Sequence, residues 1–206
     1  MEKVVLLADA ELMVRKGLTS LFSEQFGITC IDNVPDCNLV MSRLKNKAYS
    51  HLIIETVLSD GPTIGILHSI RALFPKLQIL VFSIYDEVYI RGTLLDLDIY
   101  HYVSKKTSDE DQVLQFSRFF NNDLSPLAIN RMKKNFKESD LTPRELEVYL
   151  LSSEGKSTGE IAQELNIASG TVSTIKRNIL NKKNITHWRE IKFMSRFQLF
   201  NVGELI

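Results

Sequence analysis

The 206-residue sequence is poor in cysteine and has no long apolar run. These absences argue against a disulfide-rich or zinc-binding protein and against a membrane protein. The two cysteines, Cys30 and Cys37, have a spacing that fits neither a zinc site nor a disulfide framework. The early apolar run, residues 4–8, ends at Asp9 and is too short for a signal peptide or a membrane span. We therefore expect a cytoplasmic protein with no membrane segment, no metal ion and no cofactor.

Patterns typical of catalysis are also missing. The four histidines lie far apart in the sequence, and each is interpreted as a surface or boundary residue: His51, His68, His101 and His187. We find no nucleophile–base pair and no glycine-rich phosphate loop. The sequence therefore predicts that the chain is not an enzyme.

Acidic and basic residues balance overall, 25 against 25, but their distribution is uneven. Residues 131–206 hold 13 lysines and arginines against 9 acids, a net charge of +4, so residues 1–130 carry −4. Residues 169–189 contain five cations and no acid. Such a distribution is typical of a nucleic-acid-binding module joined to an acidic domain.

Two helices are predicted at the start of the basic region. Thr142 is a natural N-cap, Pro143 suits the first helical position, and Glu145 completes a capping box. Gly155 ends this helix, whose apolar face we predict to consist of Leu146, Tyr149 and Leu150. A short helix over 157–165 follows, and the tight connection 166–168 leads into a third helix.

The third helix, which we expect Ser169 to cap, is amphipathic. Val172, Ile175 and Ile179 share one face at helical spacing. The opposite face is small, polar or cationic and has no acid: Gly170, Ser173, Thr174, Arg177 and Asn181. A solvated amphipathic helix is one interpretation of this segment alone. The preceding helix and short turn favour a helix-turn-helix that enters the DNA major groove.

These segments resemble the LuxR-type helix-turn-helix. The resemblance lies in Leu141-Thr-Pro-Arg-Glu145, Ile161-Ala162, Leu165-Asn-Ile167, Thr171-Val-Ser-Thr174, Lys176-Arg177 and Ile179. Gly170, Ile175, Lys183 and Asn184 depart from the usual family residues. In a complex with double-stranded DNA, we expect Ser173, Thr174 and Arg177 to face base edges, and Thr171, Lys176 and Lys182 to hold phosphates.

The first 121 residues alternate strand-like and helix-like segments. Strands are predicted at 4–8, 28–31, 51–54, 77–82 and 99–103, and helices at 11–24, 35–47, 62–74, 86–97 and 108–121. This alternation predicts an α/β fold with a doubly wound parallel sheet, (βα)5. In such folds the functional crevice opens at the carboxyl ends of the strands.

Asp9, Glu55, Ser83 and Lys105 stand at those strand ends and resemble the phosphorylation pocket of response-regulator receiver domains. The resemblance implies that two acids hold Mg²⁺, an Asp accepts phosphate, and a Ser or Thr and a Lys complete the pocket. With its C-terminal part, the chain is similar to NarL/FixJ-type response regulators. Leu6-Leu-Ala-Asp9, Phe74-Pro-Lys-Leu77, Leu95-Asp-Leu-Asp-Ile99 and Val103-Ser-Lys105 most resemble the Rcs capsule-synthesis regulators.

Two departures put phosphorylation at this pocket in doubt. Ala10 replaces the second metal-binding acid, and Glu55 replaces the acceptor Asp. Because Glu is one methylene longer, the in-line geometry of phosphoryl transfer would be lost. We predict a degenerate pocket in which Glu55 either mimics an acyl phosphate by reaching toward Lys105 or Ser83, or pairs with Lys105 for stability. We also expect Tyr102 to be a packed aromatic rather than a moving switch.

We predict a receiver domain at 1–121, a linker at 122–138 and a helix-turn-helix domain at 139–206. The junction around this linker contains loop residues at 121–123 and 125–126 and one short helix at 127–136, with Arg131, Lys133, Lys134 and Lys137 either near DNA phosphates or solvated. Thr186 is predicted to cap a final helix that carries an apolar stripe, which covers the core and supports dimerisation: Trp188, Ile191, Met194 and Phe197.

The sequence thus predicts a DNA-binding transcription regulator that acts as a homodimer or as the heterodimeric partner of a response regulator, on capsule or fimbrial genes. One alternative is an interaction module that sequesters other regulators and binds DNA weakly. The glycine at position 170 and the modest net charge of +4 give that alternative its support.

Overall fold

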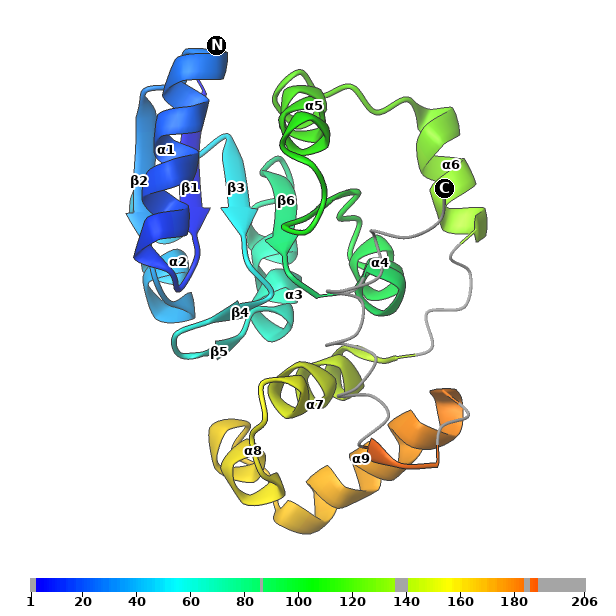
Figure 1. Cartoon of the computed structure of the whole chain (residues 1–206). Helices are drawn as coiled ribbons and strands as arrows, with labels where there is room; N and C mark the ends of the chain where they lie inside the picture. The colour runs from blue at the N-terminus through cyan, green and yellow to red at the C-terminus, as the bar shows by residue number, and fades with distance from the viewer. Residues whose placement is uncertain (1–2, 86, 136–140, 184–185, 189–206) are drawn as a thin grey trace.

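The computed structural model describes residues 3–85, 87–135, 141–183 and 186–188. Its N-terminal half is a five-stranded parallel sheet in the order β2-β1-β3-β6-β7 (Figure 1). The strands are β1 (Val4–Ala8), β2 (Cys30–Val34), β3 (His51–Ile54), β6 (Gln78–Ser83) and β7 (His101–Ser104). The predicted α/β fold is confirmed. β2 begins two residues later than predicted, because α1 extends to Phe26 and Gly27 turns the chain at φ +64°.

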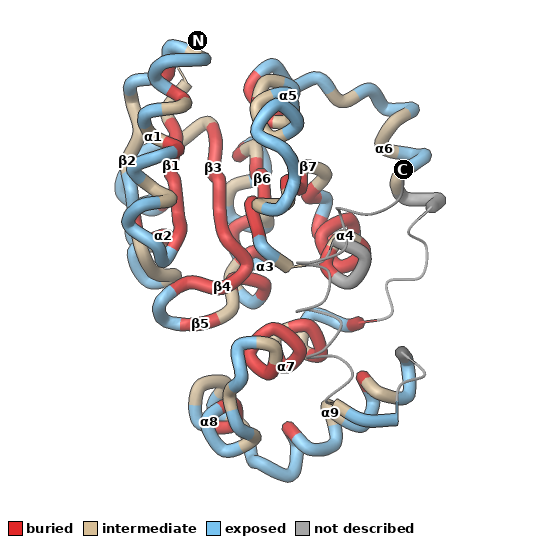
Figure 2. Tube along the Cα trace, viewed as in Figure 1, coloured by how far each residue is buried: buried red, intermediate tan, exposed pale blue. Residues whose placement is uncertain are grey.

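Five helices cover the two faces of the sheet: α1 (Leu12–Phe26), α2 (Cys37–Asn46), α3 (Ile64–Leu73), α4 (Glu87–Asp96) and α5 (Asp109–Phe120). Alternate strand residues point to opposite faces. Val5, Leu7 and Leu80 pack with the aromatic side chains of α1 and α5. Leu6, Leu52 and Val81 pack in the other cluster, with α2, α3 and α4. The strands are accordingly buried between two helical layers (Figure 2).

A two-residue-per-strand hairpin, β4 (Val57–Leu58) and β5 (Gly61–Pro62), precedes α3 and was not predicted. Gly61 adopts φ +131°, a conformation that residues with a Cβ rarely adopt. The hairpin is too short for a periodicity to show in the sequence, and it places Gly61 against Glu164 of the C-terminal half.

The C-terminal half contains α6 (Pro126–Asn135), α7 (Pro143–Ser153), α8 (Thr158–Glu164) and α9 (Ser169–Lys183). The predicted capping box of Thr142 and Glu145 is present, and Ser157 and Glu160 form a second one. One prediction is wrong: Ser169 is the first helical residue of α9 and not its cap. The amides of residues 171 and 172 donate to the carbonyl of Ala168, so the helix begins one residue earlier than a Ser169 cap would allow.

The predicted final helix lies largely outside the described residues, which include Thr186 and Trp188 but not Ile191, Met194 or Phe197. In the linker, the predicted short helix is α6, although the side chains of Lys133, Lys134 and Lys137 are not described. Among the residues that the structure does describe, no helix is both long and apolar enough to span a bilayer.

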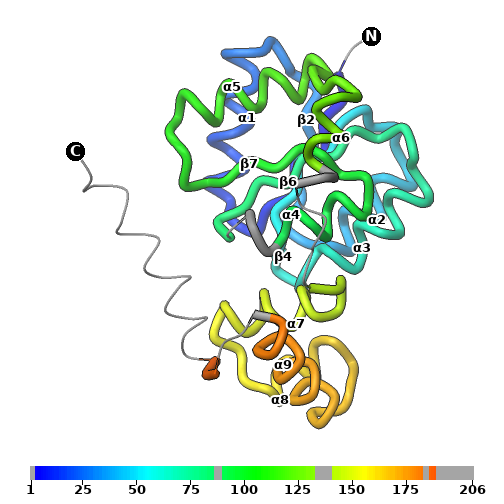
Figure 3. Tube along the Cα trace, turned by 90° about the vertical axis from the view of Figure 1, so that its right-hand side faces the viewer, coloured from blue at the N-terminus to red at the C-terminus, as the bar shows by residue number. Residues whose placement is uncertain are grey.

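Helix α7 is buried on nearly all sides and joins the two halves of the chain. Beyond the predicted face, Val148 and Leu151 are also fully buried. These side chains belong to the same apolar cluster as Leu67 of α3 and Ile90 of α4. The side-chain hydroxyl of Thr93 donates to the carbonyl of Leu141 at 3.0 Å across the same junction. Two views show α7 between the sheet domain and the α8–α9 pair (Figures 1 and 3).

The histidine interpretation is wrong for His51, which is buried, whereas His101 is half-buried, as a boundary residue is. His51 is 8% exposed, and its ring centroid lies 5.1 Å from that of Phe119. His101 contacts the same phenylalanine ring, with the centroids 5.0 Å apart. Burial lowers the pKa of each imidazole to about 4. Both residues begin strands beneath α5, a placement that their scattered positions in the sequence do not reveal.

Candidate functional site

The four polar residues predicted at the strand ends meet in one pocket. Asp9 follows β1, Glu55 follows β3, Ser83 ends β6 and Lys105 follows β7. The Lys105 ammonium lies 2.6 Å from Asp9 Oδ2 and 2.6 Å from Glu55 Oε2. Both carboxylates are almost wholly buried, so this is an ion triad shielded from solvent.

The second carboxylate oxygen of Glu55 is held by Thr56, a residue that the sequence interpretation missed. Glu55 Oε1 accepts from the Thr56 amide at 2.6 Å and from the Thr56 hydroxyl at 2.8 Å. The Thr56 hydroxyl in turn lies 2.8 Å from the hydroxyl of Ser83. Glu55 therefore reaches Lys105 directly and is linked to Ser83 through Thr56. Its position in the sequence could have indicated this role, because Thr56 is a hydroxyl residue directly after the acid at the end of a strand.

The residues of this pocket do not fit the Mg²⁺ ion that receiver domains bind. Mg²⁺ requires several hard oxygen ligands in octahedral geometry, and the side chain of Ala10 supplies none. The two carboxylates already share the ammonium of Lys105. Burial lowers the pKa of Lys105, but the charges and hydrogen bonds of Glu55 and Asp9 outweigh burial and leave that pKa raised. Lys105 is thus the cation that these acids hold.

Hydrogen bonds connect the pocket to the junction between the two halves. The Tyr85 amide donates to the Ser83 hydroxyl at 3.3 Å. Tyr102 is 6% exposed, as expected for a packed aromatic, and its hydroxyl donates to the carbonyl of Tyr85. Burial and then the nearby charge of Glu154, the residue that follows α7, raise the pKa of the Tyr85 side chain. Hydrogen bonds therefore connect Glu55 to the backbone of Tyr85, whose side chain lies close to Glu154 of the C-terminal half.

Helix α9 presents an open polar surface. Val172 and Ile179 are buried against α7 and α8. The rest of the helix surface is largely exposed, including Thr171, Ser173, Thr174 and Arg177 (Figure 2). The hydroxyls of Ser173 and Thr174 each donate at 3.0 Å to the backbone carbonyl four residues earlier. Four of the six predicted DNA contacts thus lie together on an accessible helix face.

A family model described as bacterial regulatory proteins of the luxR family matches residues 139–194. This part of the chain is similar to that family and is called the LuxR-type domain below. The response regulator VraR of Staphylococcus aureus is 28% identical over 188 residues, which is 88% of this chain and 90% of VraR. In this chain the matched segment follows a parallel-sheet domain.

Solved structures of RcsB from Salmonella enterica serovar Typhimurium have the same fold. One, bound to the rprA promoter in the presence of a phosphomimetic, has a TM-score of 0.74 and 24% identity, covering 94% of this chain and 98% of RcsB. Another, bound to the P1flhDC promoter, has a TM-score of 0.75 and 23% identity, covering 95% and 99%. Both domains are therefore present in their RcsB-like order.

Two cations of the LuxR-type domain are engaged within the domain. Lys182 Nζ lies 2.6 Å from Glu145 Oε2 and so ties the end of α9 to the capping box of α7. Lys176 Nζ lies 3.3 Å from the Thr158 hydroxyl and 5.5 Å from the centroid of the Trp188 ring. These lysines therefore contribute to the packing of the three helices, a role that the sequence interpretation did not assign to them.

Proposed function

We propose that the chain is a transcription regulator that binds double-stranded DNA through α9 and acts in the cytoplasm, where the DNA lies. The observation that carries this proposal is the exposed face of Thr171, Ser173, Thr174 and Arg177 on a helix whose other side is buried. Its support is the LuxR-type match over residues 139–194. Arg177 would read a guanine, because a guanidinium matches the two acceptors of that base.

The division of the chain at residues 121 and 139 into receiver, linker and helix-turn-helix domain belongs to the same proposal. In it the receiver is not phosphorylated in the ordinary way. Glu55 takes the acceptor position, and its carboxylate is already held by Lys105 and Thr56. The contact with Lys105 favours neither interpretation of Glu55 over the other, because a phosphate mimic and a stabilising ion pair would both make it.

Mass spectrometry after incubation with acetyl phosphate tests this part. We expect no phosphoryl adduct on the protein, under conditions that label an ordinary response regulator in the same tube. A phosphoryl adduct that is mapped to Glu55 would refute the proposed loss of phosphorylation.

DNA binding is tested by electrophoretic mobility shift at two salt concentrations. We expect a shift that weakens steeply with salt, because phosphate contacts release counterions. Arg177→Ala should weaken the shift, whereas Lys106→Met, which removes an exposed cation of the receiver, should not. If the unaltered protein gave no shift at low salt, the sequestering module would be the better description of the chain.

The activity of a regulator that is not phosphorylated would then be controlled by its assembly into dimers. We propose that the chain acts as a dimer, either with itself or as the auxiliary partner of an Rcs-type response regulator, on genes for surface structures such as capsule or fimbriae. The RcsB-like fold supports this assignment. Co-purification with a tagged response regulator is expected for the auxiliary role. A symmetrical homodimer on DNA that needs no partner would exclude that role.

A further inference from the structure

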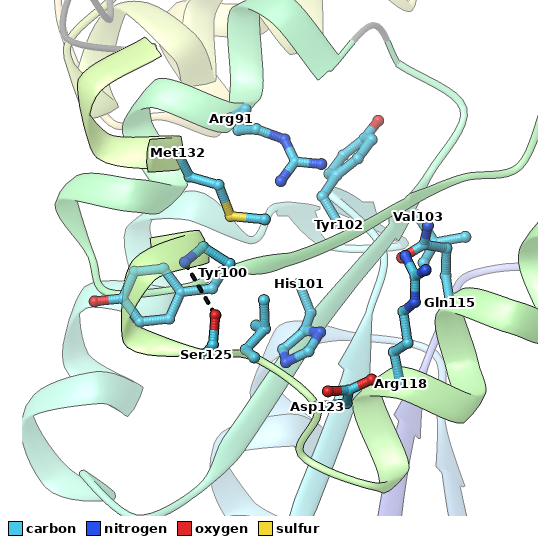
Figure 4. A pocket seen from close by; sticks show the side chains of 12 residues that line it. Arg91, Tyr100, His101, Tyr102, Val103, Gln115, Arg118, Asp123, Ser125 and Met132 are labelled. Atoms are coloured by element: carbon cyan, nitrogen blue, oxygen red, sulfur yellow. Dashed lines mark hydrogen bonds between the residues drawn. The ribbon is translucent and has the colours of Figure 1, made fainter. Parts of the chain in front are cut away.

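A cavity of about 410 Å³ lies at the edge of the sheet domain that β7 forms. Its walls come from α4, the edge strand β7, α5 and the segment that leads into α6 (Figure 4). The volume falls within the range of small-molecule sites, roughly 300–1,000 Å³. The cavity therefore has room for a ligand, and one of its walls is the linker helix.

The lining of the cavity combines aromatic side chains with arginine side chains. Tyr100, His101 and Tyr102 supply aromatic surface along β7, while Arg91 and Arg118 reach the cavity from α4 and α5. The Arg91 guanidinium lies 5.8 Å from the centroid of the Tyr102 ring. In Figure 4, Arg91 lies beside Tyr102 and Arg118 lies beside Gln115.

The charge of this lining favours an anion. The described lining residues include two guanidinium groups and a single carboxylate, that of Asp123. Burial, followed by the nearby charge of Arg91, lowers the pKa of His101 to about 4, so its ring is neutral at pH 7. Guanidinium groups bind carboxylates with two parallel hydrogen bonds and also stack on planar rings. The lining thus matches a planar molecule with one acidic group.

We propose that this cavity binds a small aromatic carboxylate. The ring of the ligand contacts the aromatic lining that β7 supplies, and its carboxylate is bound by Arg118 or Arg91. The position of the cavity gives such a ligand a route to the rest of the molecule. The hydroxyl of Tyr102, in its wall, donates to the carbonyl of Tyr85, whose side chain packs with the apolar cluster that includes α7. A ligand here would therefore supply an input that does not pass through Glu55.

Isothermal titration of the full-length protein with naphthoate tests the proposal without DNA, so its outcome is independent of the proposed DNA binding. We expect saturable binding of naphthoate that is at least about tenfold tighter than that of naphthamide, which has the same ring and no charge. Arg118→Gln should weaken naphthoate binding by about tenfold or more. Arg43→Gln, which alters an exposed arginine on α2, is the matched control and should have no effect.

Arg118 is exposed, so its replacement should leave the urea midpoint of the protein unchanged, and the affinity comparison is then made between folded proteins. Arg91→Gln provides a second variant at the other end of the cavity and should weaken naphthoate binding as well. Equal binding of naphthoate and naphthamide, unaltered affinity in both arginine variants, or no saturable binding at millimolar naphthoate would each overturn the proposal.

Discussion

Replacing Lys105 by methionine removes the cation of the buried triad and keeps most of its aliphatic stem. Asp9 and Glu55, whose side chains are 4% and 7% exposed, would then face each other without a counter-charge. Breaking a buried ion pair costs about 3–5 kcal/mol. We expect about 3 kcal/mol, at the lower end of that range, because the Lys105 side chain retains 14% exposure.

Urea unfolding followed by circular dichroism measures this loss. With a urea dependence of about 2–3 kcal/mol/M, the midpoint should fall by about 1 M. The exposed neighbour provides a control, since Lys106→Met should leave the midpoint almost unchanged. Adding Glu55→Gln to Lys105→Met should recover about 1 kcal/mol or more, because one uncompensated charge is removed. Equal midpoints for the Lys105→Met and Lys106→Met proteins would refute the assignment of a stabilising triad.

The pH dependence of the protein's stability also tests the ion triad, because the pKa shift of Lys105 fixes the direction in which stability changes with pH. The pKa of Lys105 is raised in the folded protein. A raised lysine pKa contributes stability that is fully present below the unfolded value of about 10.4 and is lost as the pH rises through the folded value. The unaltered protein should therefore lose stability above about pH 10.5. The Lys105→Met protein should not show this alkaline loss of stability when its urea midpoint is compared with that of the unaltered protein from pH 9 upward.

Three further outcomes follow from other parts of the chain. Arg177→Ala should cost about 1–3 kcal/mol at the operator and relax specificity at one position in a footprint, and an unchanged footprint would reject the groove assignment. Lys182→Ala should weaken all DNA sequences alike and reduce the salt slope by about one. It should cost less than about 1 kcal/mol of stability, because the Lys182 side chain is 40% exposed in its pair with Glu145. Burial lowers the pKa of His51 to about 4, so its contribution to stability is present above the unfolded value near 6.5 and is lost as the pH falls toward 4. His51→Leu should reduce the fall of the urea midpoint between about pH 6.5 and about pH 4. An unchanged fall would show that protonation of His51 does not cause it.

Much of the candidate site was predictable because parallel strands align their carboxyl ends at one edge of a sheet. Asp9, Glu55, Ser83 and Lys105 could be brought together from the strand pattern alone. Thr56 was missed, because the pattern locates a strand end but does not say which neighbour will satisfy a buried carboxylate. The additional roles of Lys176 and Lys182 were missed for a related reason. Cations on a helix of a DNA-binding domain suggest phosphate contacts, and only coordinates show that they also have partners within the domain.

Apart from the short β4–β5 hairpin, the sequence by itself determined the elements and their order, because helical and strand periodicities, capping residues and glycines act over a few neighbouring positions. It also determined the apolar face of α9 and therefore its polar face. Only the tertiary structure decided how α7 packs, since Val148 and Leu151 become buried by residues of α3 and α4 that lie more than fifty positions away. It likewise decided that Lys105 bridges two acids, and that His51 and His101 lie beneath α5. Those outcomes depend on surfaces that meet only after the chain has folded, and local patterns do not encode which surfaces meet.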